Sequence, residues 1–476
     1  MKTNKMNSTM FSIKGFFLVY FEILLILRAV GPYLLLPHII DTVFFWSAGF
    51  IGSLIIFVDL LMAIRDRKFK KHDIFLVLFI LIMFVSSIVN IKYGIFGNIK
   101  LLMWQLIFFF LIFQFSKDYG YNRWFKIVER VLVFSWFVII IISLSMFITK
   151  YGIKIPIQYK YYPVRIGWLG NRLFGIFTDP NFGAVTSIIV IFIGVKDIIQ
   201  NNSSLAFKVF TYLNIVLQFL FIVLSGSRTA EITLITLVFF YFLFLTSQSK
   251  RIMNIANLKR YSISLCAGIL MAIACLGIVF ITEKVVVYLP AAYSNIKNDT
   301  SNKPAKDMKE NDRKEISLAR PDTESGDVSN RRFELWSSTI EIAKKSPLVG
   351  GSPAYYIQFA HDKVPYTLMG QDNLTAHNLV FLVLAATGGL GVLIFLIFLI
   401  KSVFKALMYC FNSPTLLKKD PIFYSIIFSG GICLSSLFIT ELVLVSTIGA
   451  FIFWLSIGLI YNDEIESGGE SDSKHV

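Results

Sequence analysis

The sequence predicts an all-α, polytopic membrane protein of about 12 transmembrane helices, with a large extracytoplasmic loop that carries an amphipathic helix. Three observations predict this fold. Hydrophobic residues make up 56% of the 476-residue chain and charged residues only 16%, unlike the composition of water-soluble domains. Apolar runs of about 20 residues, enough to cross a hydrocarbon core of roughly 30 Å, recur along the chain. Lys and Arg gather between these runs.

Each apolar run is interpreted as one span. The runs lie at 15–31, 39–64, 73–90, 95–115, 130–149, 179–195, 207–224, 229–247, 261–282, 377–400, 422–440 and 442–460. The last two spans are expected to be separated by almost nothing. An even number of spans places both ends of the chain on the same side of the membrane.

These spans divide the chain into five regions. Residues 1–149 hold helices 1–5, and residues 150–282 hold helices 6–9 with a basic outer loop at 150–178. A large extracytoplasmic loop is predicted at 283–376, helices 10–12 at 377–460, and an acidic cytoplasmic tail at 461–476.

The positions of Lys and Arg indicate which side is cytoplasmic. The basic stretches RDRKFKK (65–71), Lys117 to Arg130 and QSKRIMNIANLKR (248–260) fall on the same face as the N-terminal lysines. Cytoplasmic loops carry such an excess of positive charge, so both termini are predicted to be inside the cell.

The two long outer connections differ in composition. The loop at 150–178 is basic although it faces outward, and its aromatic residues Tyr159, Tyr161, Tyr162 and Trp168 fit either an interfacial belt or a binding platform. In the larger loop, 296–330 is polar and is predicted to be a disordered tether. The apolar spacing in 331–345 predicts the amphipathic helix.

Several function classes are disfavoured by composition. The net charge of +15 is explained by the loops between spans, so we do not expect nucleic acid as a partner. The five histidines have no metal-ligand spacing, and no phosphate-binding glycine motif is present, so neither a metal nor another cofactor is expected.

Five ionisable residues stand out because all fall at the outer ends of late spans. They are Arg172 and Asp179 in GNRLFGIFTDPN, Arg228 and Glu231 in LSGSRTAE, and His377 in TAHN. Charges at membrane depth are costly and persist mainly where a partner or cavity uses them. An arginine binds an anionic group through two parallel hydrogen bonds, and a histidine exchanges a proton near neutral pH. These residues therefore suggest a binding site for an anionic substrate.

Two further cations are candidates for this site, and two simpler explanations compete with it. Arg332 on the outer helix and Arg165 in the basic loop are additional candidates for binding the anion. Alternatively, Arg228 extends toward lipid headgroups with Glu231 as its ion-pair partner. His377 alternatively is an interfacial histidine that bonds to a loop carbonyl.

Four segments in order resemble the O-antigen ligase and polymerase superfamily of bacterial envelope glycan enzymes. They are RLFGIFTDPN (172–181), LSGSRTA (224–230), RRFELWSSTIEIAKKSPLVGG (331–351) and TAHNLVFLVLAATGGLGVLIF (375–395), with the long outer loop between the second and third. The chain departs from the family pattern at Gly350 and Gly351, where the family usually has one residue between the two glycines.

The resemblance implies a membrane glycosyltransferase of the bacterial cytoplasmic membrane whose donor is a glycan linked to undecaprenyl pyrophosphate. It implies that Arg172, Arg228 and Arg332 bind the pyrophosphate, and that His377, with Asn378 beside it, lies at the reacting centre. His377 is the expected base and Glu231 the reserve. Asp179 and Arg165 are counted with the substrate-binding residues. Neither a metal nor a nucleotide is required, and single displacement with inversion is expected.

Three functions remain open at this point. The leading one is a polymerase of repeat units for O-antigen, capsule or exopolysaccharide. The second is a ligase that moves finished glycan onto another acceptor, such as a lipid core, wall polymer or protein. The third is a non-enzymatic exporter of the lipid-linked glycan, which predicts charged residues along a path through the bilayer. Membrane lipid and a chain-length regulator are the other expected partners.

Overall fold

The computed structural model describes residues 2–67, 72–156, 163–200, 204–252, 255–300, 317–318, 331–412 and 416–462, with backbone alone for 2–7 and 296–300. The predicted acidic tail lies almost entirely outside these residues, as does most of the predicted tether. The aromatic residues Tyr159, Tyr161 and Tyr162 of the basic loop also lie outside them.

The described chain is a bundle of apolar helices, which confirms the predicted fold class. Nine helices within the described residues are long and apolar enough to cross a membrane, and three shorter apolar helices match the remaining predicted spans. The long ones are α1 (Lys2–Ala29), α2 (His38–Asp66), α4 to α5 (Phe96–Ile107 and Gln114–Tyr119, joined by a π-helical turn at Phe108–Phe113), α6 (Arg123–Ile148), α7 (Pro180–Gln200), α8 (Leu205–Leu224), α9 (Arg228–Ser247), α10 (Asn257–Val286) leading into α11 (Leu289–Thr300), and α16 (Leu379–Asn412). The shorter ones are α3 (Ile74–Val89), α17 (Pro421–Ser435) and α18 (Ile448–Ile460).

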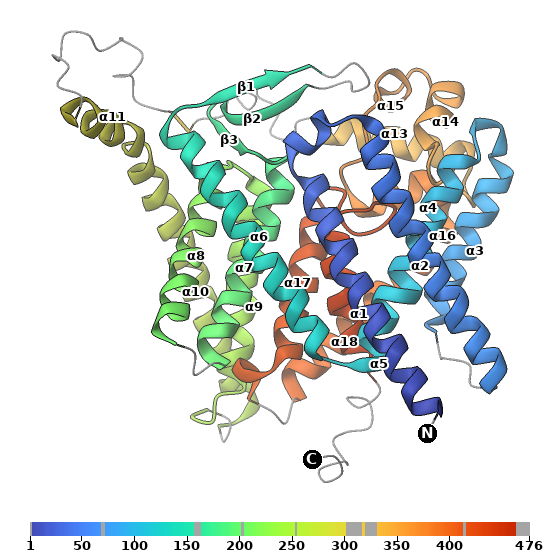
Figure 1. Ribbon diagram of the computed structural model, residues 1–476, viewed down its shortest axis with the longest axis horizontal. Helices are drawn as coiled ribbons and strands as arrows, with labels where there is room; N and C mark the ends of the chain where they lie inside the picture. The colour runs from blue at the N-terminus through green and yellow to red at the C-terminus, as the bar shows by residue number, and fades with distance from the viewer. Residues whose placement is uncertain are drawn as a thin grey trace.

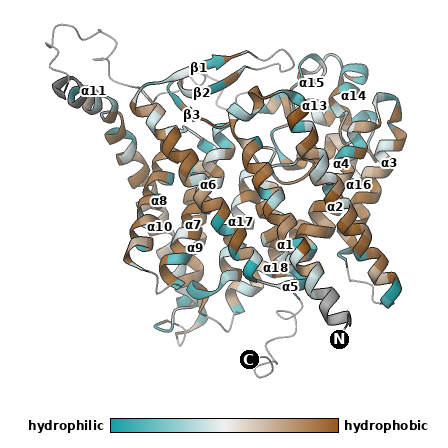
Figure 2. Cartoon of the chain, in the orientation of Figure 1, coloured by the Kyte–Doolittle hydropathy of each residue, from teal (hydrophilic) through white to brown (hydrophobic). Residues whose placement is uncertain are grey.

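The helices lie roughly side by side, and the small elements gather at one end of the bundle (Figure 1). We call this the outer end, because the sequence predicts that it faces away from the cytoplasm. Figure 2 shows hydrophobic residues along the middle of the helices, with hydrophilic residues mainly at the two ends. Helices satisfy every backbone polar group internally, which is the condition for crossing lipid. The start of α1 and the end of α18 lie at the end opposite the outer elements.

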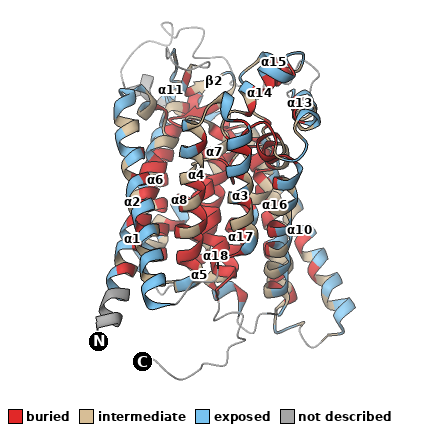
Figure 3. Cartoon of the chain, turned by 90° about the vertical axis from the view of Figure 1, so that its right-hand side faces the viewer, coloured by how far each residue is buried: buried red, intermediate tan, exposed pale blue. Residues whose placement is uncertain are grey.

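Burial places α7 at the centre of the bundle and α10 at its edge. Within its most apolar window, α7 is 78% buried inside the protein, whereas α10 is 11% buried. Figure 3 shows the same contrast, with buried residues concentrated in the middle of the bundle. The exposed apolar side chains of α10 are therefore the surface that lipid covers, and the helices around α7 form the frame for a site.

The segment predicted as a basic loop at 150–178 instead contains a three-stranded antiparallel sheet. Its strands are β1 (Gly152–Ile155), β2 (Val164–Leu169) and β3 (Arg172–Gly175), in that order. Leu169 pairs with Arg172 across a two-residue turn in which Gly170 and Asn171 both have positive φ. Such a Gly-Asn pair between short apolar runs is a hairpin signal that the prediction missed.

The predicted amphipathic helix is confirmed as α13 (Arg332–Lys345), which is followed by α14 (Tyr356–Lys363) and α15 (Leu368–Gln371). The chain then crosses α16 at close range. Gly350 has a φ of 67°, Gly388 has a φ of 68° inside α16, and the Gly351 N–H donates to the Ala385 carbonyl at 2.8 Å. The two adjacent glycines, where the sequence departs from the family pattern, thus allow two backbones to touch.

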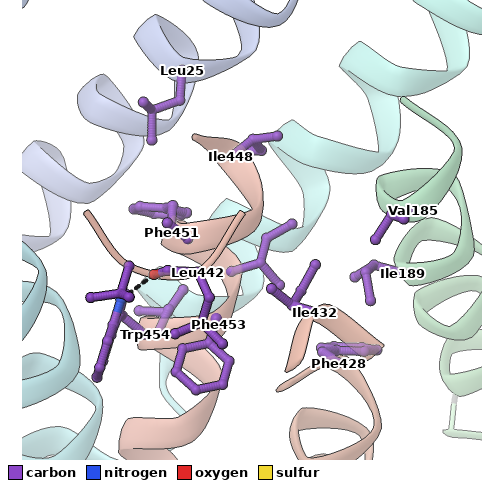
Figure 4. Packing of buried hydrophobic residues seen from close by; sticks show 14 of the residues in the cluster. Leu25, Val185, Ile189, Phe428, Ile432, Leu442, Ile448, Phe451, Phe453 and Trp454 are labelled. Atoms are coloured by element: carbon purple, nitrogen blue, oxygen red, sulfur yellow. Dashed lines mark hydrogen bonds between the residues drawn. The ribbon is translucent and has the colours of Figure 1, made fainter. Parts of the chain in front are cut away.

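The last two helices are separated by more chain than predicted. Residues 436–447 form a non-helical segment between α17 and α18, where the sequence placed almost nothing. This segment is held inside the bundle, because the Trp454 indole N–H donates to the Leu442 carbonyl at 3.0 Å. Figure 4 shows Leu442 beside Ile448, Phe451 and Trp454 in the hydrophobic core. We call residues 436–447 the outer re-entrant segment.

Candidate functional site

The sheet positions two of the predicted cations. The Arg165 and Arg172 guanidinium carbons lie 5.4 and 5.5 Å from the centre of the Phe174 ring. Arg165 is exposed and pairs with Lys154 across β1 and β2. Like charges opposite one another destabilise a sheet, so an anion near this pair would stabilise the arrangement.

Arg172 also joins the sheet to two helices. Its Nε donates to the Ser225 carbonyl at 2.6 Å, and its Nη2 donates to Asn181 Oδ1 at 2.6 Å. Ser225 lies in the turn before α9 and Asn181 in the first turn of α7. These bonds hold the β3 strand, the start of α7 and the turn that carries Arg228 in one arrangement.

Asp179 begins the central helix. Its Oδ1 accepts the N–H of Asn181 at 2.8 Å, which caps α7, and Pro180 is the first helical residue. One residue earlier, the Thr178 N–H donates to the Ala29 carbonyl at the outer end of α1 at 2.9 Å. Asp179 is thereby fixed between α1 and α7.

Arg228 and Glu231 lie in the first turn of α9. Ser227 caps this helix by accepting the N–H of Ala230 at 3.3 Å. Arg228 is exposed, and within the described residues it takes part in no hydrogen bond or ion pair, so the ion pair with Glu231 considered above does not form there. The Arg228 guanidinium is therefore available to an anionic ligand.

His377 is held in an unusual backbone conformation. Its φ of 47° is in the left-handed region, which costs a non-glycine residue of order 1–3 kcal/mol and is concentrated at functional sites. The neighbouring residues on both sides are fixed: the Trp336 indole N–H of α13 donates to the Ala376 carbonyl at 3.1 Å, and Asn378 Nδ2 donates to the Leu437 carbonyl at 2.8 Å. The chain on both sides of His377 is therefore anchored, to α13 through Ala376 and to the outer re-entrant segment through Asn378.

Asn378 is engaged within the protein at both ends of its amide. Besides the bond to Leu437, its Oδ1 accepts the N–H groups of Val380 and Phe381 at 2.9 and 3.2 Å, which caps α16. The Leu379 N–H also donates to the Ser436 carbonyl at 2.8 Å. These contacts favour a positioning role for Asn378 beside His377, and its contact with substrate stays a prediction.

Burial and two charged residues determine the charge state of His377. Burial lowers the pKa of His377, the nearby Asp179 carboxylate raises it, and the Arg332 guanidinium lowers it, with a net downward shift. Arg332 is half-buried, and its guanidinium carbon lies 5.8 Å from the centre of the Phe438 ring. The lowered pKa keeps the imidazole neutral at pH 7, which is the state a general base requires.

The pH dependence of activity should report these interactions. With neutral His377 as the predicted general base, activity should be lost as pH falls through a pKa below the usual 6.5 for histidine. Asp179→Asn should move that acid limb to lower pH, and Arg332→Gln should move it to higher pH, because the two charges act on the imidazole in opposite directions. The measurement is the pH profile of kcat/KM. Shifts of the same sign in both variants would contradict this account.

Glu441 is a site residue that the sequence reasoning missed. It lies in the outer re-entrant segment with a fully buried side chain, and its Oε2 accepts the Ser435 hydroxyl at 3.2 Å. Its Oε1 has no partner within the described residues. Burial raises the pKa of Glu441 well above its usual range; the Ser435 bond lowers it and the charge of Asp179 raises it. The signal was present, because Glu441 is an acidic residue set between two apolar runs.

The structure therefore brings His377 within electrostatic reach of Asp179 and Arg332, and Glu441 within electrostatic reach of Asp179, at the outer end of the bundle. Arg172 joins them through its bonds around the start of α7. Glu231 lies in the first turn of α9 and is not among the charges that shift the pKa of His377, which are those of Asp179 and Arg332.

A comparison with known protein families matches part of the chain. Residues 213–396 match the family model described as O-antigen ligase. The match supports the O-antigen ligase/polymerase superfamily, and with the apolar helices it indicates a bacterial inner-membrane enzyme acting on lipid-linked glycans. No curated protein matches the chain.

The O-antigen ligase match covers part of the site. Arg228, Glu231, Arg332, His377 and Asn378 lie inside the matched residues. The remaining members of the site lie outside the match and are contributed by the sheet, by α7 and by the outer re-entrant segment; they are Arg165, Arg172, Asp179 and Glu441. Within the described part of the chain, no group of three His, Cys, Asp or Glu side chains is arranged to hold a metal ion.

Proposed function

We propose that this protein polymerises lipid-linked oligosaccharide repeat units at the outer face of the membrane. In this reaction the growing glycan leaves one undecaprenyl pyrophosphate carrier and is joined to the terminal sugar of a new lipid-linked unit. The observation that carries the proposal is the half-buried His377, which lies at the outer end of the bundle between the opposing charges of Asp179 and Arg332.

The chemistry follows from the charges. The acceptor hydroxyl oxygen attacks the anomeric carbon of the donor, and neutral His377 accepts the hydroxyl proton. The bond from that carbon to the pyrophosphate oxygen breaks, and its electron pair stays on the pyrophosphate. Negative charge on this leaving group grows as the bond breaks, and the guanidinium groups of Arg172, Arg228 and Arg332 stabilise it. Inversion at the anomeric carbon is the expected outcome.

Two other functions make different predictions. A ligase uses the same donor and base but a different acceptor, so the residues around His377 do not distinguish it from a polymerase. An exporter needs charged groups along a path through the bilayer, whereas Asp179, Arg332, His377 and Glu441 gather at the outer level.

The test of function is the length distribution of glycan in cells that lack this protein and are complemented with the wild-type chain. Single repeat units without polymer in the deleted cells support the polymerase. Long polymer that remains on its lipid carrier would mean a ligase. Lipid-linked units trapped on the cytoplasmic face would mean an exporter.

Arg228→Lys should reduce polymer synthesis roughly tenfold or more while protein abundance stays normal. The exposed guanidinium has no partner in the described chain, so the change keeps the charge, breaks no internal contact and removes only the planar fork that binds phosphate through two hydrogen bonds. The measurement is initial rate at limiting donor. A rate equal to wild type would show that Arg228 does not bind phosphate bidentately.

A further inference from the structure

A second cationic cavity lies beside the proposed active site. It has a volume of about 320 Å³ and opens between the outer ends of α1, α2 and α4, the outer loop before α14 and the outer re-entrant segment. Its charged and aromatic lining consists of Arg28, Phe45, Lys100, Trp104 and Tyr356. We call it the α1–α4 cavity.

Two cations share one wall of this cavity. The Arg28 guanidinium carbon is 3.7 Å and the Lys100 Nζ is 5.5 Å from the centre of the buried Phe45 ring, so the two charges are no more than about 9 Å apart. Arg28 pairs with Asp41 at 3.1 Å, and Asp41 also acts on Lys100. The cluster therefore carries two positive charges and one negative charge, an excess of positive charge that suits an anionic ligand.

A second observation indicates an anionic ligand. Lys100 is half-buried, and within the described residues it forms no ion pair. An unpaired cation at membrane depth is costly. An anion bound in the cavity would offset this cost.

The cavity borders the site around His377 on two sides. Arg28 precedes Ala29, whose carbonyl accepts the N–H of Thr178, and Thr178 precedes Asp179. On the other side, the cavity wall formed by residues 444–446 belongs to the same re-entrant segment as Glu441. A ligand anchored in the cavity would extend toward the reacting centre.

We propose that the α1–α4 cavity binds the pyrophosphate of the acceptor, the lipid-linked unit whose own sugar–phosphate bond stays intact. This inference rests on the proposed polymerase function. Such a reaction brings two lipid pyrophosphates to one protein, and only the donor pyrophosphate leaves. The arginines near His377 serve the leaving group, and Arg28 and Lys100 hold the other pyrophosphate away from the base. Three aromatic rings, those of Phe45, Trp104 and Tyr356, line the space for its prenyl or sugar groups.

The experiment separates the two substrates chemically. One synthetic donor has its terminal sugar hydroxyl blocked and therefore only donates. One acceptor carries a methylene-bridged diphosphonate with a carbon link to the sugar and therefore only accepts. Full-length protein in zwitterionic-lipid nanodiscs is assayed for transfer between them, and KM is measured for each. The variants are Lys100→Gln, Lys100→Arg and the control Lys284→Gln, which removes an exposed cation from the outer end of α10.

Lys100→Gln should raise the KM for the acceptor at least about tenfold and leave the KM for the donor unchanged, because one charge-assisted contact is lost. Lys100→Arg should restore most of the affinity, and Lys284→Gln should behave as wild type. An increase in the donor KM instead, or no change in either, would overturn the proposal.

The same nanodiscs distinguish another phosphate source. With phosphatidylglycerol added, native mass spectrometry counts bound lipid. If Lys100→Gln removes bound phosphatidylglycerol while the acceptor KM is unchanged, the cavity holds a membrane headgroup and the proposal fails. If wild-type protein transfers no glycan to the lipid-linked acceptor but does transfer it to a different acceptor, the polymerase function itself is wrong.

Discussion

Replacing His377 by alanine is expected to abolish polymer and leave single lipid-linked repeat units, at normal protein abundance. Burial and Arg332 keep the imidazole neutral against the effect of Asp179, so its loss removes the proposed base for the acceptor hydroxyl. General-base catalysis contributes roughly 10²–10⁴-fold, which is enough to remove visible polymer. The measurement is glycan length on a gel, with membrane-protein abundance determined in the same cells.

The left-handed backbone of His377 calls for a second variant. Asparagine adopts a φ near 47° more readily than alanine, so His377→Asn preserves the local fold while removing the titratable group. It should be as inactive as His377→Ala. Polymer of normal length in cells that express His377→Asn would show that this side chain is not the base.

Gly350→Val is expected to prevent stable folding. A β-carbon at Gly350 would meet the Gly388 nitrogen at 2.6 Å and the Ala386 carbonyl carbon at 2.7 Å, and backbone atoms cannot move aside as a flexible side chain does. The φ of 67° adds about 1–2 kcal/mol for a β-branched residue, and overpacking adds about 1–3 kcal/mol more. The measurements are the abundance of the protein in membranes and its melting temperature in detergent.

Gly277→Val is the matched control for that substitution. Gly277 lies in α10 at the edge of the bundle, and a β-carbon there meets nothing within 4 Å. This variant should reach wild-type abundance and melting temperature. If Gly350→Val were as stable as Gly277→Val, the close crossing of the outer loop over α16 would be wrong.

The helices could be predicted from the sequence because lipid imposes a single requirement. An apolar run of about 20 residues must be helical to satisfy its backbone, so each predicted span has a helix in the structure. The exceptions lie at the outer end of the bundle. The sheet at 152–175 satisfies backbone groups by pairing between its own strands, and the Leu442 carbonyl in the outer re-entrant segment accepts the Trp454 indole N–H.

The candidate site was predictable in part for a related reason. Arg172, Asp179, Arg228 and His377 are conspicuous as ionisable residues at span ends, so their shared level follows from counting residues. Which of them meet depends on helix packing, which one sequence does not encode locally. Glu441 was missed because the sequence places it at the boundary between two predicted spans. Its burial depends on the packing of α17 and α18.

The packing of the first helix against the last has a consequence for biogenesis. Phe21 of α1 lies 6.2 Å from Phe451 of α18, and Phe109 lies 4.5 Å from Trp454, measured between ring centres. Helices synthesised early therefore cannot form these packing contacts until α18, more than 300 residues later in the chain, has been synthesised. Because the Leu437 carbonyl that accepts the Asn378 amide also lies in this late segment, a partly translated chain lacks the contact that positions Asn378 beside His377. The proposed catalytic centre is therefore assembled only once α17, the outer re-entrant segment and α18 have been synthesised.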